Sequence, residues 1–317
     1  MENFADISQA EKVYAVDGIN QGLRNDGREL MDFRPIVVEF DVMPNTHGSA
    51  RVRLGQTDLI AAIKLKMRQV TDTEDFSNRI DFYVTCSAVA STDFAGKHGD
   101  DCAQRIASLL RKAYRNDFIL PELKKFKLSK DRYYQTKVDI LILQYDGNAV
   151  DAASVAAKAA LSDLKYIIPT MIARDKGKTV PQLPGKARSQ IQTLDISNVP
   201  MIVTLNSFGD NIFLDATLEE EQCVGGVLHV GVIPLKEENY MNEIEMKEQA
   251  ENCFITLLKN TKPNIFHEEK FDQVLSTGIE AAIELNRVLQ NRIEEYKREP
   301  KKNAEERIES FMGDLQF

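Results

Sequence analysis

Between residues 36 and 88, apolar and polar side chains alternate with the two-residue period of a β-strand. Gly, Pro and Asn residues separate the runs, which cover residues 36–42, 50–54, 58–67 and 80–86. Successive strands joined by short turns predict an antiparallel meander, because a half-buried antiparallel sheet shows this alternation. The fold of this chain is therefore expected to start from a sheet, with helices added later.

Helical spacing alternates with strands in the rest of the chain. Gly99, Asp100 and Asp101 are predicted to begin a helix that continues to Tyr114, because negative charge is favourable at a helix N-terminus. A buried strand is predicted at 137–145, and a thin, alanine-rich helix that can approach a sheet closely at 151–161. Further strands are predicted at 201–205, 211–215, 224–233 and near 253–258, before a long helix at 268–297. Both halves place strands before a helix, which predicts an α+β fold and indicates a duplicated unit.

Composition narrows the class of protein. The 317 residues suffice for two domains or one large one, and 43% hydrophobic residues can bury a core. The charge of −9 argues against a surface that coats nucleic acid, so any such contact is expected to be local. No apolar run is long enough to span a membrane, and the acidic start does not resemble a secretory signal. A nuclear or cytoplasmic protein with four reduced, structural cysteines is expected.

Five segments are predicted along the chain. A capping box at Ser8 and Glu11 begins a short helix, with Val13 and Tyr14 on the same face as Ala10. Gly, Pro and Lys gather at 174–190, where we place a linker. The predicted segments are 1–28, 29–173, 174–190, 191–298 and a charged tail at 299–317. Within the fourth, the glutamate-rich stretch 236–250 is interpreted as a solvated excursion, and the tail is equally compatible with docking on a neighbour or on its own domain.

Two stretches are candidates for chemistry. The acidic cluster from Asp215 to Glu221 follows a strand and could supply a general acid or hold a metal, but a solvated first helical turn is the favoured interpretation. The loop from Asp146 to Val150 precedes the alanine-rich helix, where exposed N–H groups could bind an anion. Since that loop has no Arg or Lys within reach, we expect a poor phosphate site. The four histidines and four cysteines are too scattered for metal sites, and no serine-nucleophile motif is present.

Basic residues form a second pattern. Arg51 and Arg53 lie on one face of a predicted strand, and Lys112 and Arg115 lie near one side of a predicted helix with Arg105. These side chains could grip RNA phosphates without reading bases, although a solvated charged face is the more common outcome.

Several motifs together resemble the RNase PH family. They are Asp26-Gly27-Arg28 with Phe33-Arg34, the stretch from Gly48 to Asp58, Asp146-Gly147-Asn148, and the cluster from Asp215 to Glu221. The chain is most similar to the non-catalytic branch that helps build the ring of the RNA exosome, over roughly residues 5–235. The resemblance implies an RNase PH-like fold of the ribosomal protein S5 domain 2-like type, with two pseudo-symmetric βαβα-type halves.

The resemblance also implies partners and a location. RNase PH-like exosome subunits form a six-membered ring, S1/KH-type subunits cap it, and RNA passes through its pore. We therefore expect those subunits and RNA as partners, no cofactor and no membrane. Nucleus and nucleolus, and also the cytoplasm, are the expected compartments.

Active members of the family use inorganic phosphate to release nucleoside diphosphates from RNA. Their phosphate-binding Gly-Thr-Arg matches Gly147, Asn148 and Ala149, so the guanidinium is absent. Asp215 matches the catalytic aspartate and Glu221 a second acidic position, while Lys112 and Arg115 are similar to basic residues that face an RNA path. The resemblance implies an inactive ring subunit. The alternatives are an active phosphorolytic 3′–5′ exoribonuclease, alone or with a partner that supplies the arginine, and an unrelated small-molecule enzyme.

Overall fold

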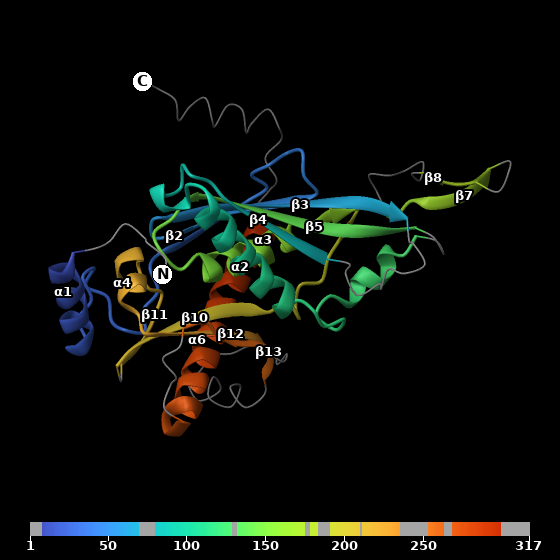
Figure 1. Ribbon diagram of the computed structural model, residues 1–317. Helices are drawn as coiled ribbons and strands as arrows, with labels where there is room; N and C mark the ends of the chain where they lie inside the picture. Colours follow the sequence, from blue (N-terminus) through green and yellow to red (C-terminus); the bar gives the residue numbers. More distant parts are fainter. Residues whose placement is uncertain are drawn as a thin grey trace.

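The computed structural model describes residues 8–69, 80–128, 132–174, 178–182, 191–209, 211–234, 253–262 and 268–298. Its first sheet has five strands in the order β1-β2-β3-β5-β4 (Figure 1). Their bounds are β1 Ile36–Phe40, β2 Gly48–Leu54, β3 Thr57–Gln69, β4 Ile80–Cys86 and β5 Arg132–Gln144. The strands lie where the alternating pattern predicts them.

The predicted four-strand meander is only partly right. β1, β2 and β3 pair antiparallel in chain order, as expected. β5 then inserts between β3 and β4: it is antiparallel to β3 and parallel to β4, pairing Phe82 with Val138. A two-residue period reports that a strand has two different faces, but it does not report which strand lies beside it.

Two helices cover one face of this sheet. α2 (Lys97–Ala113) packs on β4, and α3 (Ala149–Ser162) packs on β2 and β3. The covered face presents alternate strand residues such as Val52, Ala61 and Ile140, all at most 2% exposed. α2 begins at Lys97 after Gly96 and not at Gly99, which lies within the helix against the carbonyl oxygens of Phe94 and Cys86. Gly99 therefore permits close packing and does not act as the predicted cap.

The second sheet has the order β11-β10-β12-β13. Its strands are β10 Met201–Phe208, β11 Asn211–Leu214, β12 Gly226–Pro234 and β13 Cys253–Asn260. α3 also contacts β10, and the long α6 (Glu268–Arg298) packs on β10 and β12 (Figure 1). One hydrophobic cluster runs from the first sheet through α2, α3 and α6 to the second sheet. The strands and helices predicted for both halves are confirmed, with ends shifted by a few residues.

The N-terminal helix docks on the second half. α1 (Gln9–Asn20) begins with the predicted capping box between Ser8 and Glu11. Its buried residues are Ala15 and Ile19, whereas Val13 and Tyr14 are 50% and 70% exposed. Ile19 packs with Phe213 beside α4 (Leu218–Cys223).

Some predictions concern residues outside the described part. The excursion at 236–250 and the tail at 299–317 lie outside it, as do most residues of the predicted linker. Within that linker, Arg174 ends β7 (Thr170–Arg174), which pairs with β8 (Lys178–Gln182). On either side of the linker, β6 (Lys165–Tyr166) pairs with β9 (Gln192–Thr193). Two short 3-10 helices complete the described elements, η1 (Thr92–Phe94) and η2 (Pro121–Phe126). None of the described helices has the length and apolar character needed to cross a membrane.

Candidate functional site

The candidate site lies where three distant parts of the chain meet. The loop before α3 approaches the turn between β11 and α4 so closely that a Cβ on Gly147 would lie 2.5 Å from the carbonyl oxygen of Ala216. Gly147 has a φ of 82°, so glycine is needed here both for space and for backbone conformation. The third part is the segment between α1 and β1, which supplies Arg24, Arg28 and Arg34.

Asp215 is the centre of the site and is fully buried. Its carboxylate accepts from the backbone N–H, Nε and Nη2 of Arg34 at 2.8, 2.9 and 2.8 Å. It also accepts from Nη1 of Arg28 at 3.0 Å and from Nδ2 of Asn148 at 2.8 Å. Burial by itself raises the pKa of Asp215, but the hydrogen bonds and charge of Arg34 outweigh it, and the pKa lies below its ordinary value. Asp215 is therefore a paired carboxylate without a proton to donate.

Arg34 bridges the two halves and has no unused donor. Besides the two bonds to Asp215, its Nη1 donates to the carbonyl oxygen and carboxylate of Asp146 at 2.6 and 3.0 Å, and Nη2 donates to the carbonyl of Gly147 at 3.3 Å. All five guanidinium N–H groups thus have acceptors within the protein. The expectation that no cation reaches this loop is wrong, because Arg34 arrives from more than 100 residues away in sequence.

Glu221 occupies the anion-binding end of α3. Its carboxylate accepts from the backbone N–H of Asn148 at 2.7 Å and from the hydroxyl of Tyr145 at 2.6 Å. Burial raises the pKa of Glu221 in spite of these bonds. Ala149, at the predicted phosphate position, is 5% exposed. Oδ1 of Asn148, an acceptor that would repel an anion, is buried and has no hydrogen-bond partner among the described residues.

The acidic cluster is not the solvated turn that the sequence favoured. Thr217 does cap α4, in a capping box with Glu220. Glu220, however, is 2% exposed and forms a buried ion pair with Arg24. Arg24 also donates to the carbonyl oxygens of Leu214 and Asp215 at 2.8 and 2.7 Å. Asp215 and Glu220 are buried because the N-terminal segment supplies cations that the local sequence does not show, whereas Glu219 is exposed.

A buried polar chain continues from the site into the core. Asp151 accepts from Asn148, from the N–H of Thr204 at 3.0 Å and from its hydroxyl at 2.7 Å, and that hydroxyl lies 2.9 Å from Nδ1 of His229. Burial raises the pKa of Asp151 to about 7 and lowers that of His229 to about 4. No residue pattern in the sequence predicts a role for Asp151, His229 or the three arginines. Arg28 and Arg34 do belong to the motif Asp26-Gly27-Arg28 with Phe33-Arg34, and the family resemblance of this motif is what could have indicated them.

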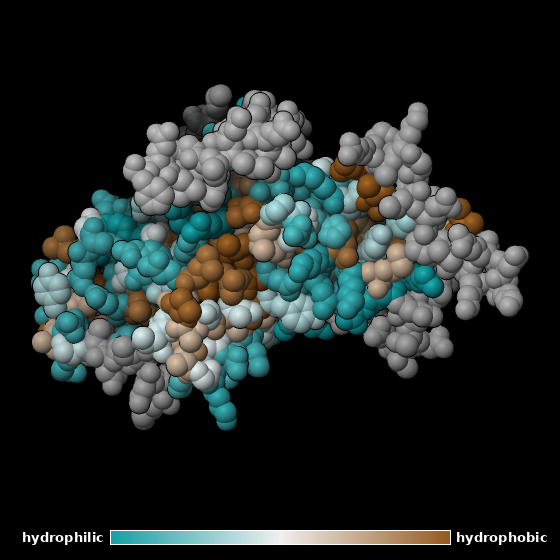
Figure 2. Space-filling model, turned by 90° about the horizontal axis from the view of Figure 1, so that it is seen from above, coloured by the Kyte–Doolittle hydropathy of each residue, from teal (hydrophilic) through white to brown (hydrophobic). Residues whose placement is uncertain are grey.

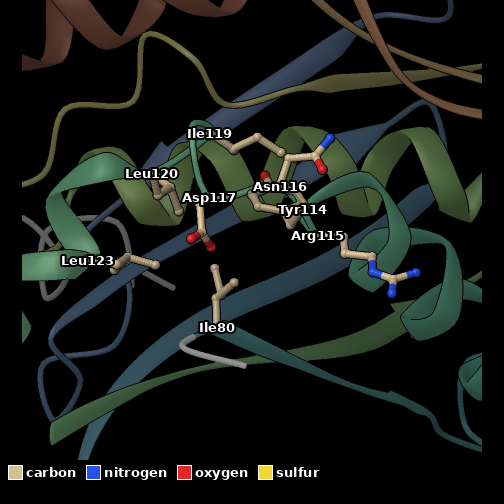
Figure 3. A pocket seen from close by; sticks show the side chains of 8 residues that line it. All are labelled: Ile80, Tyr114, Arg115, Asn116, Asp117, Ile119, Leu120 and Leu123. Carbon is tan, nitrogen blue, oxygen red and sulfur yellow. The ribbon is translucent and has the colours of Figure 1, made fainter. Parts of the chain in front are cut away.

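The predicted RNA-binding residues lie outside this site. Arg51 and Arg53 share the face of the first sheet opposite α2 and α3, where they pair with Asp58 at 2.6 Å and Glu39 at 2.5 Å. Lys112 and Arg115 are exposed at the C-terminal end of α2, with no ion pair among the residues described. Arg115 borders a small pocket with Ile80 and Asp117, and its guanidinium points away from the pocket in Figure 3. In the described ranges, no three His, Cys, Asp or Glu side chains are grouped so that they could hold a metal ion.

Residues 32–166 match the RNase PH family, described as the 3′ exoribonuclease family, domain 1. The exosome complex component Rrp42 of Pyrococcus furiosus is 24% identical over 295 residues, which cover 93% of this chain and 98% of that protein. The exosome complex component rrp45 of Schizosaccharomyces pombe is 27% identical over 232 residues, which cover 73% of this chain and 77% of that protein.

Solved structures share the fold. A chain of the Archaeoglobus fulgidus exosome with RNA bound to the active site superposes with a TM-score of 0.68 at 20% identity, covering 88% of this chain and 97% of that one. The α+β, RNase PH-like fold predicted from the sequence is thereby confirmed. The matched residues 32–166 contain the loop before α3 and most of the motifs that suggested the resemblance. The fold and the relatives agree, and the chain is similar to the RNase PH family over residues 32–166.

Proposed function

We propose that the chain is a catalytically inactive RNase PH-like subunit of an exosome core ring, which supports 3′–5′ RNA degradation and ribosomal RNA processing. In this proposal, the chain completes the ring and helps to form the RNA channel. RNA cleavage is then carried out by other proteins of the complex.

The absence of a usable anion site among the described residues carries this proposal. Phosphorolysis needs a cationic donor that holds phosphate beside the scissile bond, and removal of one such donor typically costs about 3–4 kcal/mol in the transition state. The side chain of Ala149 has no hydrogen-bond donor. All guanidinium donors of Arg34 are already bonded to Asp146, Gly147 and Asp215, and the backbone N–H of Asn148 is bonded to Glu221. The position that corresponds to the catalytic acid, Asp215, is held by five N–H groups. A phosphate ion would have to displace internal carboxylates to bind here.

Exposed apolar strand surface supports a role in assembly. β13 is an edge strand, and its residues Phe254, Ile255 and Leu258 are 41%, 36% and 46% exposed. On the face of the first sheet opposite α2 and α3, Val37 and Leu141 are 46% and 40% exposed. Figure 2 shows the molecule from above, with a hydrophobic area between hydrophilic ones. Large exposed apolar surfaces and open sheet edges are typical of chains that pack against other subunits.

We further propose Lys112 and Arg115 as the local RNA contacts. Both are exposed on one helix end, and no carboxylate among the described residues pairs with either. Arg51 and Arg53 are weaker candidates, because Asp58 and Glu39 already neutralise them. S1/KH-type cap subunits and RNase PH-like neighbours remain the proposed protein partners, in the nucleus, nucleolus and cytoplasm.

The experiment is incubation of the purified chain with labelled RNA and inorganic phosphate. An active RNase PH-type enzyme serves as the positive control. We expect no nucleoside diphosphate above background, with or without phosphate. The proposal is overturned if phosphate-dependent diphosphate release follows the chain through purification and disappears in both Asp215→Asn and Glu221→Gln, with folding of each variant checked by circular dichroism.

A further inference from the structure

A chain of hydrogen bonds connects the buried carboxylate of Asp151 with an exposed residue. The hydroxyl of Thr204 in β10 donates to Oδ1 of Asp151 in α3 at 2.7 Å. The same hydroxyl oxygen lies 2.9 Å from Nδ1 of His229, which faces Thr204 from the neighbouring strand β12. Nε2 of His229 lies 3.4 Å from the hydroxyl of Thr261, which directly follows β13. Asp151, Thr204 and His229 are buried, whereas Thr261 is exposed.

The partners of each atom fix the direction of these hydrogen bonds. Oδ2 of Asp151 accepts from the backbone N–H of Thr204 and from Nδ2 of Asn148, both at 3.0 Å, while Oδ1 accepts from the Thr204 hydroxyl. Because a hydroxyl has one proton, Thr204 donates to Asp151 and must accept from His229. The proton of the neutral ring is then on Nδ1, and Nε2 accepts from Thr261. The whole chain therefore donates towards the Asp151 carboxylate.

The surrounding charges keep His229 neutral and make Asp151 the group that takes up a proton. Arg105 of α2 and Lys259 of β13 face His229, and burial together with these two charges lowers its pKa to about 4. The charge nearest to Asp151 is Asp215, which shares a side-chain donor with it and is itself paired with arginines. Burial, with a smaller contribution from Asp215, raises the pKa of Asp151 to about 7.

We propose that Thr261, His229 and Thr204 form a proton relay that connects the solvent with the buried carboxyl group of Asp151. Thr261 takes up a proton from the solvent and passes its own hydroxyl proton to Nε2 of His229. The Nδ1 proton moves to Thr204, and the former hydroxyl proton of Thr204 moves to Oδ1 of Asp151. In total one proton is taken up, the ring of His229 stays neutral, and every hydrogen bond of the chain is reversed.

The relay gives a buried contact between the two halves access to the pH of the solvent. Asp151 joins α3 to β10, and Asn148 links it to the carboxylate of Asp215. Proton uptake removes a negative charge from this contact without opening the core. The inference does not rest on the proposed function, since it depends only on the hydrogen bonds of the four residues.

The experiment is NMR spectroscopy of the full chain, labelled with ¹⁵N in histidine and ¹³C in aspartate. It uses a solution, or a sedimented sample if the chain self-associates, and His229→Gln assigns the ring signals. We expect a neutral ring with its proton on Nδ1 at about pH 8.5 and on Nε2 at about pH 5.5. The carboxyl signal of Asp151 should change with the same midpoint. A single tautomer of His229 over this range, or a cationic ring, overturns the proposal without any variant.

Variants test the connection between the two groups. The amide of Asp151→Asn places its oxygen at Oδ2, which accepts two N–H groups, and its NH₂ towards Thr204, so His229 should have its proton on Nε2 at every pH. Thr204→Val removes the connecting hydroxyl, and the ring should no longer follow Asp151. The matched control is Thr256→Val, whose hydroxyl donates to Gly231 outside the chain, and it should behave as the wild type. A pH-dependent tautomer in Thr204→Val overturns the relay.

The solvent end is tested separately. Thr261→Ile places an apolar side chain over Nε2 of His229, so the interchange of the two tautomers should slow at least about tenfold, as measured by relaxation dispersion. Interchange at the wild-type rate would show that protons reach Asp151 by another route, and would overturn the proposed path through Thr261.

Discussion

At the scale of single residues, Asp215 shows how a buried carboxylate can hold a molecule together. It is enclosed by Arg28, Arg34 and Asn148, with φ at 48°, a left-handed conformation that is unfavourable for a residue with a Cβ. Asn148 has the same unusual conformation, with φ at 54°. Strained backbone of this kind persists only where the surroundings impose it. Here the ion pairs between the N-terminal segment and the second half supply that constraint.

Asp215→Asn is therefore expected to destabilise the protein by about 3–5 kcal/mol, because it removes the fully buried countercharge that the guanidinium groups of Arg28 and Arg34 share. Glu39→Gln, in the exposed pair with Arg53, is the matched control and should cost about 0–1 kcal/mol. Urea unfolding followed by circular dichroism measures both. Equal losses in the two variants would contradict the central role given to Asp215.

Lys158 is the second unusual charge. It is 1% exposed, and its ammonium donates to the carbonyl of Val199 at 2.7 Å and to Oδ1 of Asn286 at 2.6 Å, with no carboxylate partner among these contacts. Burial lowers the pKa of Lys158 from 10.5 to about 7. Between about pH 7 and pH 10.5, Lys158 therefore keeps its proton in the unfolded chain and has lost it in the folded chain.

The free energy of unfolding should therefore rise with pH between about 7 and 10.5 through this group, by up to about 1.4 kcal/mol per pH unit. Lys158→Met should flatten this part of the profile, whereas Lys125→Met, at an exposed ion pair with Glu122, should not. Denaturant unfolding at several pH values between 7 and 9.5 gives the measurement. Parallel profiles for the wild type and Lys158→Met would show that Lys158 keeps an ordinary pKa.

At the scale of elements, α3 joins the two sheets. Its small side chains let it approach β2, where a Cβ on Gly48 would lie 2.7 Å from the carbonyl oxygen of Ala160. β11 pairs only with the second half of β10, and α3 borders the rest of that strand. There Ser154 and Asp151 accept from the N–H groups of Ile202 and Thr204 at 2.9 and 3.0 Å. The helix therefore completes the hydrogen bonding of a strand edge as well as filling the core.

At the opposite edge, β13 exposes apolar side chains, although α2 also contacts this strand, and these side chains predict an interface. Leu258→Lys should leave the stability of the isolated chain within about 0.5 kcal/mol of the wild type, since Leu258 is 46% exposed. It should, however, reduce co-purification with RNase PH-like partners at least about tenfold. Val288→Lys on α6, 49% exposed, is the control and should assemble normally. Normal assembly of Leu258→Lys would exclude β13 from the interface.

At the scale of the whole molecule, three parts depend on one another. The first sheet with α2 and α3, the second sheet with α6, and the N-terminal segment with α1 share buried contacts at the Asp215 site and in the core. The predicted division into five segments stays a prediction. The shared core indicates that the two halves fold together rather than as independent units.

Size measurement tests the proposed place of this molecule in a ring. Light scattering coupled to gel filtration should show self-association or poor recovery of the chain alone, because β13 and the open sheet face expose apolar surface. Co-expression with RNase PH-like subunits should give a particle of the size of a ring. A monodisperse monomer that binds none of these subunits would contradict the proposed place in a ring.

The residue patterns were sufficient for the type and order of most elements. Alternation located the strands, and alanine located α3. These features depend on the residues of one segment and on whether they are buried. A period or a motif reports that kind of local information directly.

The identity of each segment's neighbours was decided only in the tertiary structure. The sequence showed Arg34 and Asp215 separately, but only folding brings these residues, 181 positions apart, into contact. Folding also buries Glu220 and inserts β5 between β3 and β4. A carboxylate is predicted to be solvent-exposed when no basic residue lies near it in the sequence, although its countercharge can come from a distant part of the chain. Its energy depends on that distant partner, and no local pattern encodes which partner it will be.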